Sequence, residues 1–195
     1  MTLPDDTAGR YSAVADGFTA LVAGTRDWDA PAPVAGWTAQ DVVWHLVDWI
    51  PGVLADGAGL DLPRRDPQTP DPAADWAAFD TAMRAVVGRA DLAEAAFAHP
   101  QAGSMPLGTA IDMLITPDVF MHSWDLARAT GQPITLDPDY AAGLLNGMEG
   151  VEVMLRSSGH YGQRVETAPD ADVQTRLIAF IGRDPAWTPM TRESE

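Results

Sequence analysis

Apolar residues recur at intervals of three and four along most of this chain, and this spacing constrains its fold more than any other feature. The spacing places the apolar residues on one face of an α-helix, whereas a half-buried strand would alternate apolar and polar residues. Several amphipathic helices joined by mostly ordinary loops are typical of an all-α bundle, in which sites are built between facing helices. Residues 91–98 are compatible with either a helical turn or a strand. The pattern predicts helices over about residues 5–23, 38–52, 74–89, 107–130, 138–156 and 170–181.

Two of these predicted helices contain a proline that could end or bend the helix. Thr38 is a candidate N-cap with Asp41 three residues later, which is the arrangement of a capping box. Further along the same helix, Pro51 should kink or end it. In the longest predicted helix, Pro117 interrupts the apolar pattern. That helix is therefore either kinked at the proline or restarts there, with Thr116 as its N-cap.

The composition limits the chemistry that the chain can supply by itself. It has no cysteine, which excludes disulfides, thiolate metal sites and a cysteine nucleophile, and which is compatible with a reducing cytoplasm. Every basic residue is an arginine, so Schiff-base chemistry and a P-loop lysine are excluded as well. The formal net charge of −16 would repel a phosphate backbone, so we expect no nucleic-acid partner.

The length and the apolar runs indicate the broad class of protein. A chain of 195 residues fits a single domain, residues 1–195. No apolar run approaches the roughly 18 residues of a membrane span, and the acidic first residues do not form a signal peptide. We therefore expect a cytoplasmic protein with no membrane partner.

Three residues form a candidate metal site. Asp118 and His122 are four residues apart in a predicted helix, which places their side chains on one face with Cβ atoms roughly 5–6 Å apart. His45 lies among apolar residues of a second predicted helix, where an imidazole needs a reason to face the core. Two imidazoles and one carboxylate suit a divalent ion, with zinc as our first choice and nickel, iron or manganese as alternatives. Three protein ligands leave coordination positions open, as in sites that act on a reactant.

Each of these residues also has an ordinary structural interpretation. His45 could be a core histidine satisfied by one hydrogen bond, and Asp118 could be a first-turn acidic residue favoured by the helix dipole. Asp125 could compete with Asp118 as the carboxylate ligand; we interpret it as a group that orients a histidine or pairs with Arg128. Burying the imidazoles of His45 and His122 together with the Asp118 carboxylate would cost several kcal/mol if no shared metal ion compensated them. That cost favours the metal site.

Three stretches of the chain resemble one known family. They are Gly-Trp-Thr-Ala-Gln-Asp-Val-Val-Trp-His-Leu at 36–46, the stretch from Asp118 that includes His-Ser-Trp-Asp-Leu-Ala at 122–127, and Gly-Arg-Asp-Pro at 182–185. Together they are similar to the DinB/YfiT-like metalloproteins. Within these proteins, the chain is most similar to the actinobacterial branch related to mycothiol-dependent maleylpyruvate isomerase. The resemblance covers nearly the whole chain.

The resemblance implies a fold, a ligand set and a function. The fold would be a DinB-like four-helix bundle with additional short helices, in which His45, Asp118 and His122 hold a divalent metal. The function would be that of a transferase or isomerase that uses mycothiol, or another low-molecular-weight thiol, to act on a small electrophile. The thiol would supply the sulfur that this cysteine-free chain lacks. The sequence departs from the isomerase at Asp118, where that enzyme carries a glutamate.

Other functions and partners remain open at this point. A non-catalytic metal-binding or stress-response protein is the alternative function, and a bundle whose degenerate site binds no metal is a third interpretation. The expected partners are a small-molecule thiol and an electrophilic substrate. Because bundles of this kind often pair through one helical face, a homodimer is a further expectation.

Several remaining polar and aromatic residues each have two interpretations. Arg183 could bind a substrate carboxylate or pair with an acidic neighbour. His160 could be a base, a fourth ligand or an ordinary loop residue, and His99 is interpreted as a surface residue. Three tryptophans near the ligands could line an apolar pocket or belong to the core; they are Trp44, Trp49 and Trp124.

Overall fold

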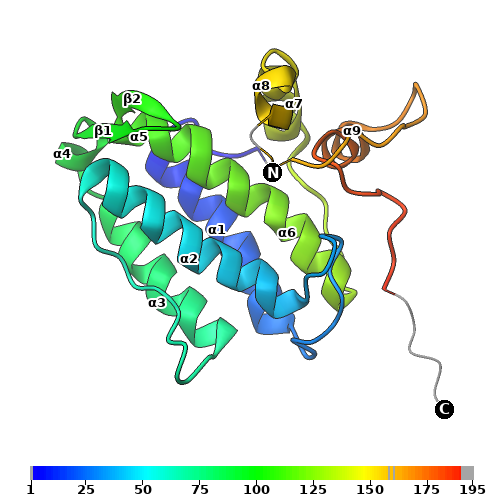
Figure 1. Ribbon diagram of the computed structural model, residues 1–195, viewed down its shortest axis with the longest axis horizontal. Helices are drawn as coiled ribbons and strands as arrows, with labels where there is room; N and C mark the ends of the chain where they lie inside the picture. Colours follow the sequence, from blue (N-terminus) through cyan, green and yellow to red (C-terminus); the bar gives the residue numbers. More distant parts are fainter. Residues whose placement is uncertain (1, 158, 160, 190–195) are drawn as a thin grey trace.

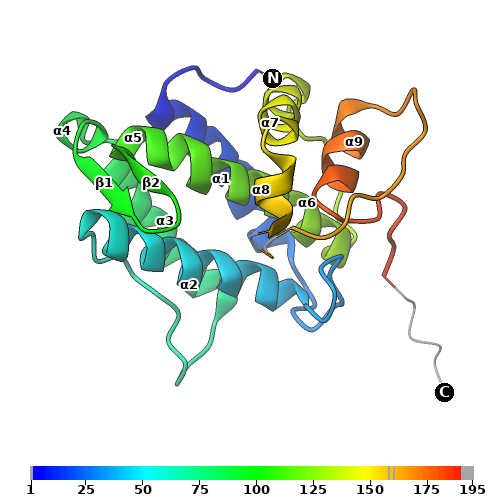
Figure 2. The ribbon, with the colours of Figure 1, turned by 45° about the horizontal axis from the view of Figure 1, so that its top comes forward.

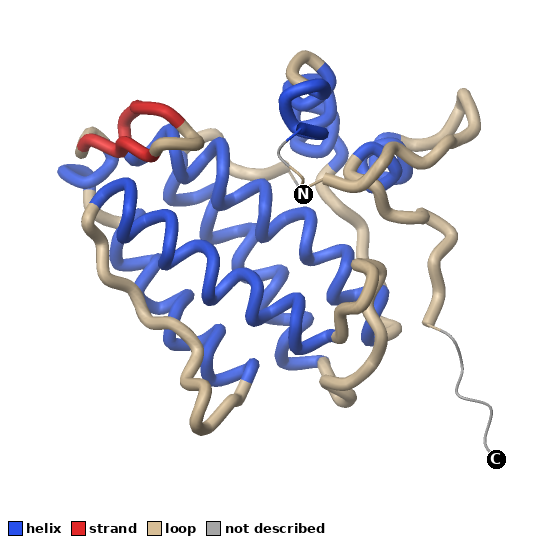
Figure 3. Tube along the Cα trace, in the orientation of Figure 1, coloured by secondary structure: helices blue, strands red, loops and turns tan. Residues whose placement is uncertain are grey.

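Four long helices form the body of the protein, and the predicted all-α fold class is confirmed (Figures 1 and 3). Helices α1 (Thr7–Gly24) and α2 (Ala39–Ala58) lie on opposite sides of a ring of four helices. Each of them packs against both α3 (Pro72–Val87) and α6 (Thr116–Thr130), so that the four helices enclose a common apolar core. This computed structural model describes residues 2–157, 159 and 161–189.

The core consists of the apolar faces that the sequence pattern predicted. Fully burying a side chain of this size contributes roughly 1.5–3 kcal/mol, so the core accounts for much of the stability of the bundle. None of the described helices is both long and apolar enough to cross a membrane. Large side chains of the core include Phe18, Leu46, Ile50, Trp76, Phe79, Met83 and Trp124.

Helix α2 begins as predicted but does not end at its proline. The Asp41 carboxylate accepts hydrogen bonds from the backbone N–H of Thr38 at 2.8 Å and from its hydroxyl at 2.7 Å. The helix then continues through Pro51 to Ala58 and ends at Gly59, which has a left-handed φ of 66°. A proline inside a helix costs about 3 kcal/mol. Burial of Ile50 and other apolar residues around the proline offsets that cost.

The stretch 107–130 is helical throughout, as α5 (Leu107–Ala110), the π-helical turn η1 (Ile111–Ile115) and α6. The N–H of Thr116 bonds to the carbonyl of Ile111, five residues earlier, and Thr116 has helical angles of φ −59° and ψ −44°. Thr116 is therefore not an N-cap, and that alternative was wrong. A wider π turn suits Pro117, which has no N–H and would crowd the carbonyl four residues before it.

A short helix and a hairpin close one end of the bundle. Residues 91–98 take part in both of the structures considered for them, since α4 (Ala90–Ala93) is followed by β1 (Ala96–His99). Strand β1 pairs antiparallel with β2 (Gly103–Pro106). The ring of Phe97 lies so close to Gly57 of α2 that a Cβ at Gly57 would be 2.2 Å from a ring carbon.

The remaining helices lie outside the four-helix ring, on the side of α6 (Figure 2). The single helix predicted over 138–156 is divided into α7 (Pro138–Glu149) and α8 (Glu152–Ser157), because the chain turns at Gly150. Helix α9 (Val173–Phe180) packs against α7. After α9 the chain returns towards α6, where it contributes to the site described next.

Candidate metal centre

The three predicted ligands meet between α2 and α6. Their ligand atoms all lie within 4.8 Å of one another. Asp118 is the common neighbour, because its Oδ2 is 3.3 Å from Nε2 of His45 and its Oδ1 is 3.6 Å from Nε2 of His122. Two atoms each bound about 2.1 Å from a tetrahedral ion lie about 3.4 Å apart. Both separations are close to this value, although they involve different oxygens of the Asp118 carboxylate, so the three side chains are near enough to share one ion.

The Asp118 carboxylate provides an independent test of this fit. Its Oδ2 is buried and, among the described residues, accepts no hydrogen bond, although the His45 ring is only 3.3 Å away. A buried acceptor without a partner costs about 1–3 kcal/mol, and more when it is charged. A cation bound by this carboxylate and the two imidazoles would remove that cost. The donor set of two nitrogens and one oxygen also suits zinc and its neighbours in the first transition row.

The other nitrogen of the His122 ring is bonded to a second carboxylate. Nδ1 of His122 lies 2.9 Å from Oδ2 of Asp125, which is completely buried. Donation from Nδ1–H to that carboxylate fixes the tautomer whose Nε2 lone pair is directed towards Asp118. The two carboxylates therefore occupy opposite nitrogens of one imidazole. This geometry favours Asp118 over Asp125 as the carboxylate ligand.

Arg183, in the C-terminal segment, binds both oxygens of the Asp125 carboxylate. The series His122–Asp125–Arg183 is called the hydrogen-bonded relay below. Nε of Arg183 is 3.3 Å from Oδ1 of Asp125, and a terminal nitrogen is 3.1 Å from Oδ2. Burial alone would raise the pKa of Asp125, but the hydrogen bond from His122 and the charge of Arg183 outweigh it and lower that pKa. Arg183 thus forms the ion pair that was one of its two interpretations. Of the two interpretations of Asp125, its contact with His122 agrees with a group that orients a histidine, whereas no ion pair with Arg128 is present among the described residues, because the Arg128 guanidinium lies over the Trp124 ring.

Two glycines allow the C-terminal segment to reach Asp125. Gly182 has a φ of +87°, and a Cβ at this position would lie 2.6 Å from the Cα of Gly162. The two backbones therefore cross in direct contact, immediately before Arg183. Tyr161 lies next to the crossing; burial raises the pKa of its phenol, and the negative charge of Asp118 raises it further. Sequence reasoning did not identify Tyr161 as a neighbour of the site, since the turn that contains it carries no motif.

Tryptophan rings cover the two histidines. The Trp37 ring centre is 5.1 Å from that of His45 and 5.8 Å from that of His122, with which it is stacked at 17°. The Trp49 ring is stacked on His45 at 6.1 Å and 11°. Trp37 was not among the tryptophans predicted near the ligands. It precedes α2, and its position depends on how the preceding loop folds back, where Pro31 and Thr38 form an isolated bridge.

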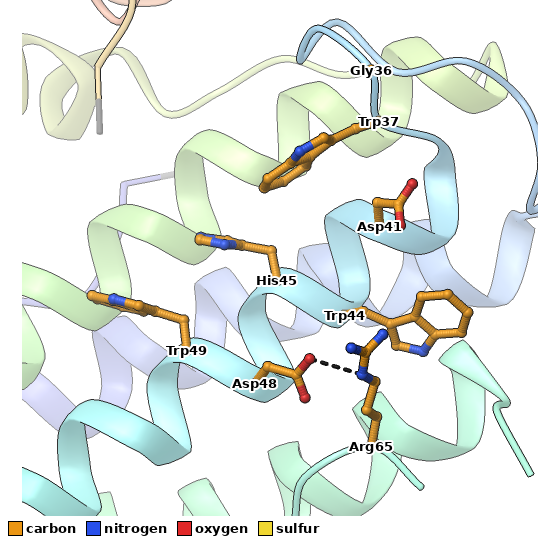
Figure 4. Close-up of a pocket in the computed structure, with 8 residues that line it drawn as sticks. All are labelled: Gly36, Trp37, Asp41, Trp44, His45, Asp48, Trp49 and Arg65. Carbon is orange, nitrogen blue, oxygen red and sulfur yellow. Dashed lines mark ion pairs between the residues drawn. The ribbon is translucent and has the colours of Figure 1, made fainter. Parts of the chain in front are cut away.

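The other two predicted tryptophans have different surroundings. Trp124 is buried in the core, as one of its two interpretations required. Trp44 is half-buried and lines a groove of about 520 Å³ onto which His45 also opens (Figure 4). The groove extends along α2 from Trp37 to Trp49, with Arg65 on its rim. A reactant in this groove could approach the ligand cluster from the α2 side.

Among the described residues, His99 is the histidine outside this cluster. His99 is on β1, where its ring stacks on Phe97 at 6.3 Å and its Nδ1 accepts a hydrogen bond from the N–H of Gln101 at 3.3 Å. His99 therefore has a structural environment of its own in the hairpin. His160 lies outside the described residues.

Two mycobacterial proteins are similar to this chain over most of its length. They are uncharacterized protein MT0763 of Mycobacterium tuberculosis strain CDC 1551 / Oshkosh and uncharacterized protein Rv0738 of strain H37Rv. Each is 33% identical over 174 residues, which make up 86% of this chain and 92% of the relative. No protein-family model matches the chain, and no solved structure matches it significantly.

Proposed function

The chain belongs to the same family as these two mycobacterial proteins, and we propose that it is a divalent-metal-binding protein of the DinB/YfiT-like kind. His45, Asp118 and His122 would hold the ion. One observation carries this proposal: three ligand atoms from two helices lie within 4.8 Å of one another, and one of the carboxylate oxygens is buried without a hydrogen bond. Zinc is the first choice for this donor set, with nickel, iron or manganese as alternatives.

We infer further that the site serves catalysis. Three protein ligands leave coordination positions open, and His45 lines a groove large enough for a small molecule. A divalent ion in such a site stabilises a bound thiolate as a nucleophile. Because the chain has no cysteine, the thiol would be a small molecule, and the family resemblance points to mycothiol. The proposed reaction is a thiol-dependent transfer or isomerisation of a small electrophile.

Residues around the three ligands would have separate roles in supporting the site. Asp125 and Arg183 hold the His122 ring in the orientation that presents Nε2 to the site. Trp37 and Trp49 would pack against the His45 ring and hold it in place beside the groove. A cytoplasmic location is part of the proposal, and the cysteine-free composition is compatible with it.

Cobalt substitution tests the metal and the thiol together. Protein reconstituted with Co²⁺ should show the visible absorption of a low-coordinate site, and N-acetylcysteine should add a sulfur-to-cobalt charge-transfer band. His45→Ala should show neither signal, whereas the control His99→Ala should show both. A cobalt spectrum that N-acetylcysteine leaves unchanged would favour the non-catalytic metal-binding alternative. Failure of the wild type to bind cobalt would contradict the whole proposal.

A further inference from the structure

The groove along α2 has an aromatic wall on the side of the candidate metal centre. The rings of Trp37, His45 and Trp49 follow one another along this wall (Figure 4). The ring of His45 is nearly parallel to that of Trp49, with an angle of 11° between them. A wall of this kind favours a ligand with a flat, apolar body, because aromatic rings stack on flat groups.

The opposite wall carries an arginine whose position is fixed by two contacts. Nε of Arg65 lies 2.8 Å from Oδ2 of Asp48, and its guanidinium carbon lies 5.2 Å from the centre of the Trp44 ring (Figure 4). Trp44 is itself held by a hydrogen bond from Nε1 to Asp75 at 3.2 Å. Arg65 is therefore anchored at the groove even though its side chain is 42% exposed and belongs to the loop between α2 and α3.

The two carboxylates of the groove already have partners. Asp41 accepts two hydrogen bonds from Thr38 at the start of α2, and Asp48 pairs with Nε of Arg65. The contacts with Asp48 and Trp44 use Nε and one face of the guanidinium, and its terminal N–H groups have no hydrogen-bond partner in the part of the chain that the structure describes. Guanidinium groups bind carboxylates through two parallel hydrogen bonds. A local cation matters here, because a chain with a net charge of −16 does not attract anions by its overall field.

We propose, resting on the metal-binding function proposed above, that this groove binds a small carboxylic acid with a flat, unsaturated or aromatic body. The carboxylate pairs with the terminal N–H groups of Arg65. The flat body lies against the wall formed by Trp37 and Trp49, and the end remote from the carboxylate reaches His45. Arg65 is thus the residue that determines specificity for an acid.

Benzoate and benzamide are suitable probes, since they share a ring and differ in charge. Binding can be followed by NMR through the indole N–H signals of the seven tryptophans. We expect the wild type to bind benzoate more tightly than benzamide. Arg65→Gln should weaken benzoate binding roughly tenfold, the usual effect of losing a hydrogen bond to a charged group, and should leave benzamide binding unchanged. Arg64→Gln is the matched control, because Arg64 is the adjacent exposed residue and does not line the groove.

The same titrations on zinc-loaded and chelator-treated protein separate this inference from the proposed function. Benzoate that binds only to the ion would lose affinity on chelation but not in Arg65→Gln, and that result would overturn the acid-binding groove. Equal affinities for benzoate and benzamide would overturn it as well. Protein that takes up no zinc but still binds benzoate in an Arg65-dependent way would support the groove and contradict the metal function.

Discussion

His122 and His45 present the same ring nitrogen to the same carboxylate, but the fold holds the two rings by different means. The His122 side chain is 7% exposed, and its other nitrogen is hydrogen-bonded to Asp125, which in turn accepts hydrogen bonds from Arg183. The His45 side chain is 28% exposed and lies between the rings of Trp37 and Trp49. A hydrogen-bonded carboxylate fixes the orientation of a ring and raises its basicity, whereas aromatic contacts mainly fix its position.

This difference assigns separate tasks to the two helices. The α6 half of the site, with Asp118 and His122, has the rigid and buried support that a metal anchor needs. The α2 half, with His45, borders the groove and is the side from which a reactant would enter. Strong support on one side and access on the other suit a site that must hold an ion and still exchange its other ligands.

Removing the carboxylate behind His122 should have the largest effect. Asp125→Asn should reduce zinc affinity about 10–100-fold, because the tautomer and orientation of His122 are no longer fixed. It should also cost about 3 kcal/mol of unfolding free energy, since Arg183 loses the partner of a buried ion pair. Competition with a zinc chelator and urea denaturation measure the two quantities. A loss of stability with unchanged zinc affinity would mean that the relay supports only the fold.

The two histidines should differ in what they contribute to the metal-free protein. His122→Ala should lower the unfolding free energy by about 1–3 kcal/mol, because it removes the hydrogen bond from Nδ1 to the buried Asp125 carboxylate, which then keeps only Arg183 as a partner. His45→Ala should lower it by less than His122→Ala does, because the more exposed His45 ring loses aromatic contacts but no hydrogen bond to a buried carboxylate. Urea denaturation in the presence of chelator makes the comparison. Equal losses in the two variants would remove the contrast between the two halves of the site.

The close contact between the backbones of Gly162 and Gly182 should influence zinc affinity indirectly, through Arg183. Gly182→Ala places a Cβ where the backbone of Gly162 lies and requires a left-handed conformation of a residue that disfavours it. We expect Arg183 to be displaced from Asp125 and zinc affinity to fall roughly tenfold. Gly143→Ala is a suitable control, because nothing within 4 Å obstructs a Cβ there. Chelator competition that gives wild-type affinity for Gly182→Ala would show that the crossing does not position Arg183.

The aromatic support of His45 should matter least for metal affinity. Trp49→Leu removes a stacked ring but keeps an apolar side chain, so zinc affinity should fall by less than about threefold, within the usual energy of an aromatic pair. The same chelator competition measures this change. A loss as large as that of Asp125→Asn would mean that ring contacts, and not the hydrogen-bonded relay, control the site.

Local patterns were sufficient for the parts of the site that lie on one element. Asp118 and His122 could be paired from their spacing, because one helix fixes their relative position whatever the rest of the chain does. The capping box at Thr38 is local for the same reason. Rules for proline were less reliable: α2 continues through Pro51, because burial of its apolar face outweighs a cost that the rule treats in isolation.

Residues whose positions depend on the path of a loop could not be placed in advance. Trp37 and Arg65 reach the groove from two different loops, and no periodicity describes either one. Arg183 is 58 residues from Asp125, its partner in the ion pair. The sequence offered acidic neighbours for Arg183 but no means of choosing among them, because the choice depends on how the segment after α9 returns to α6.

The metal content of the untagged protein tests the central claim most directly. Elemental analysis after reconstitution should give about one zinc ion per chain for the wild type and for His99→Ala, as expected for a single three-ligand site. His45→Ala and His122→Ala should each contain almost none. Full occupancy in either ligand variant, or no bound zinc, nickel, iron or manganese in the wild type, would contradict the assignment of His45, Asp118 and His122 as metal ligands.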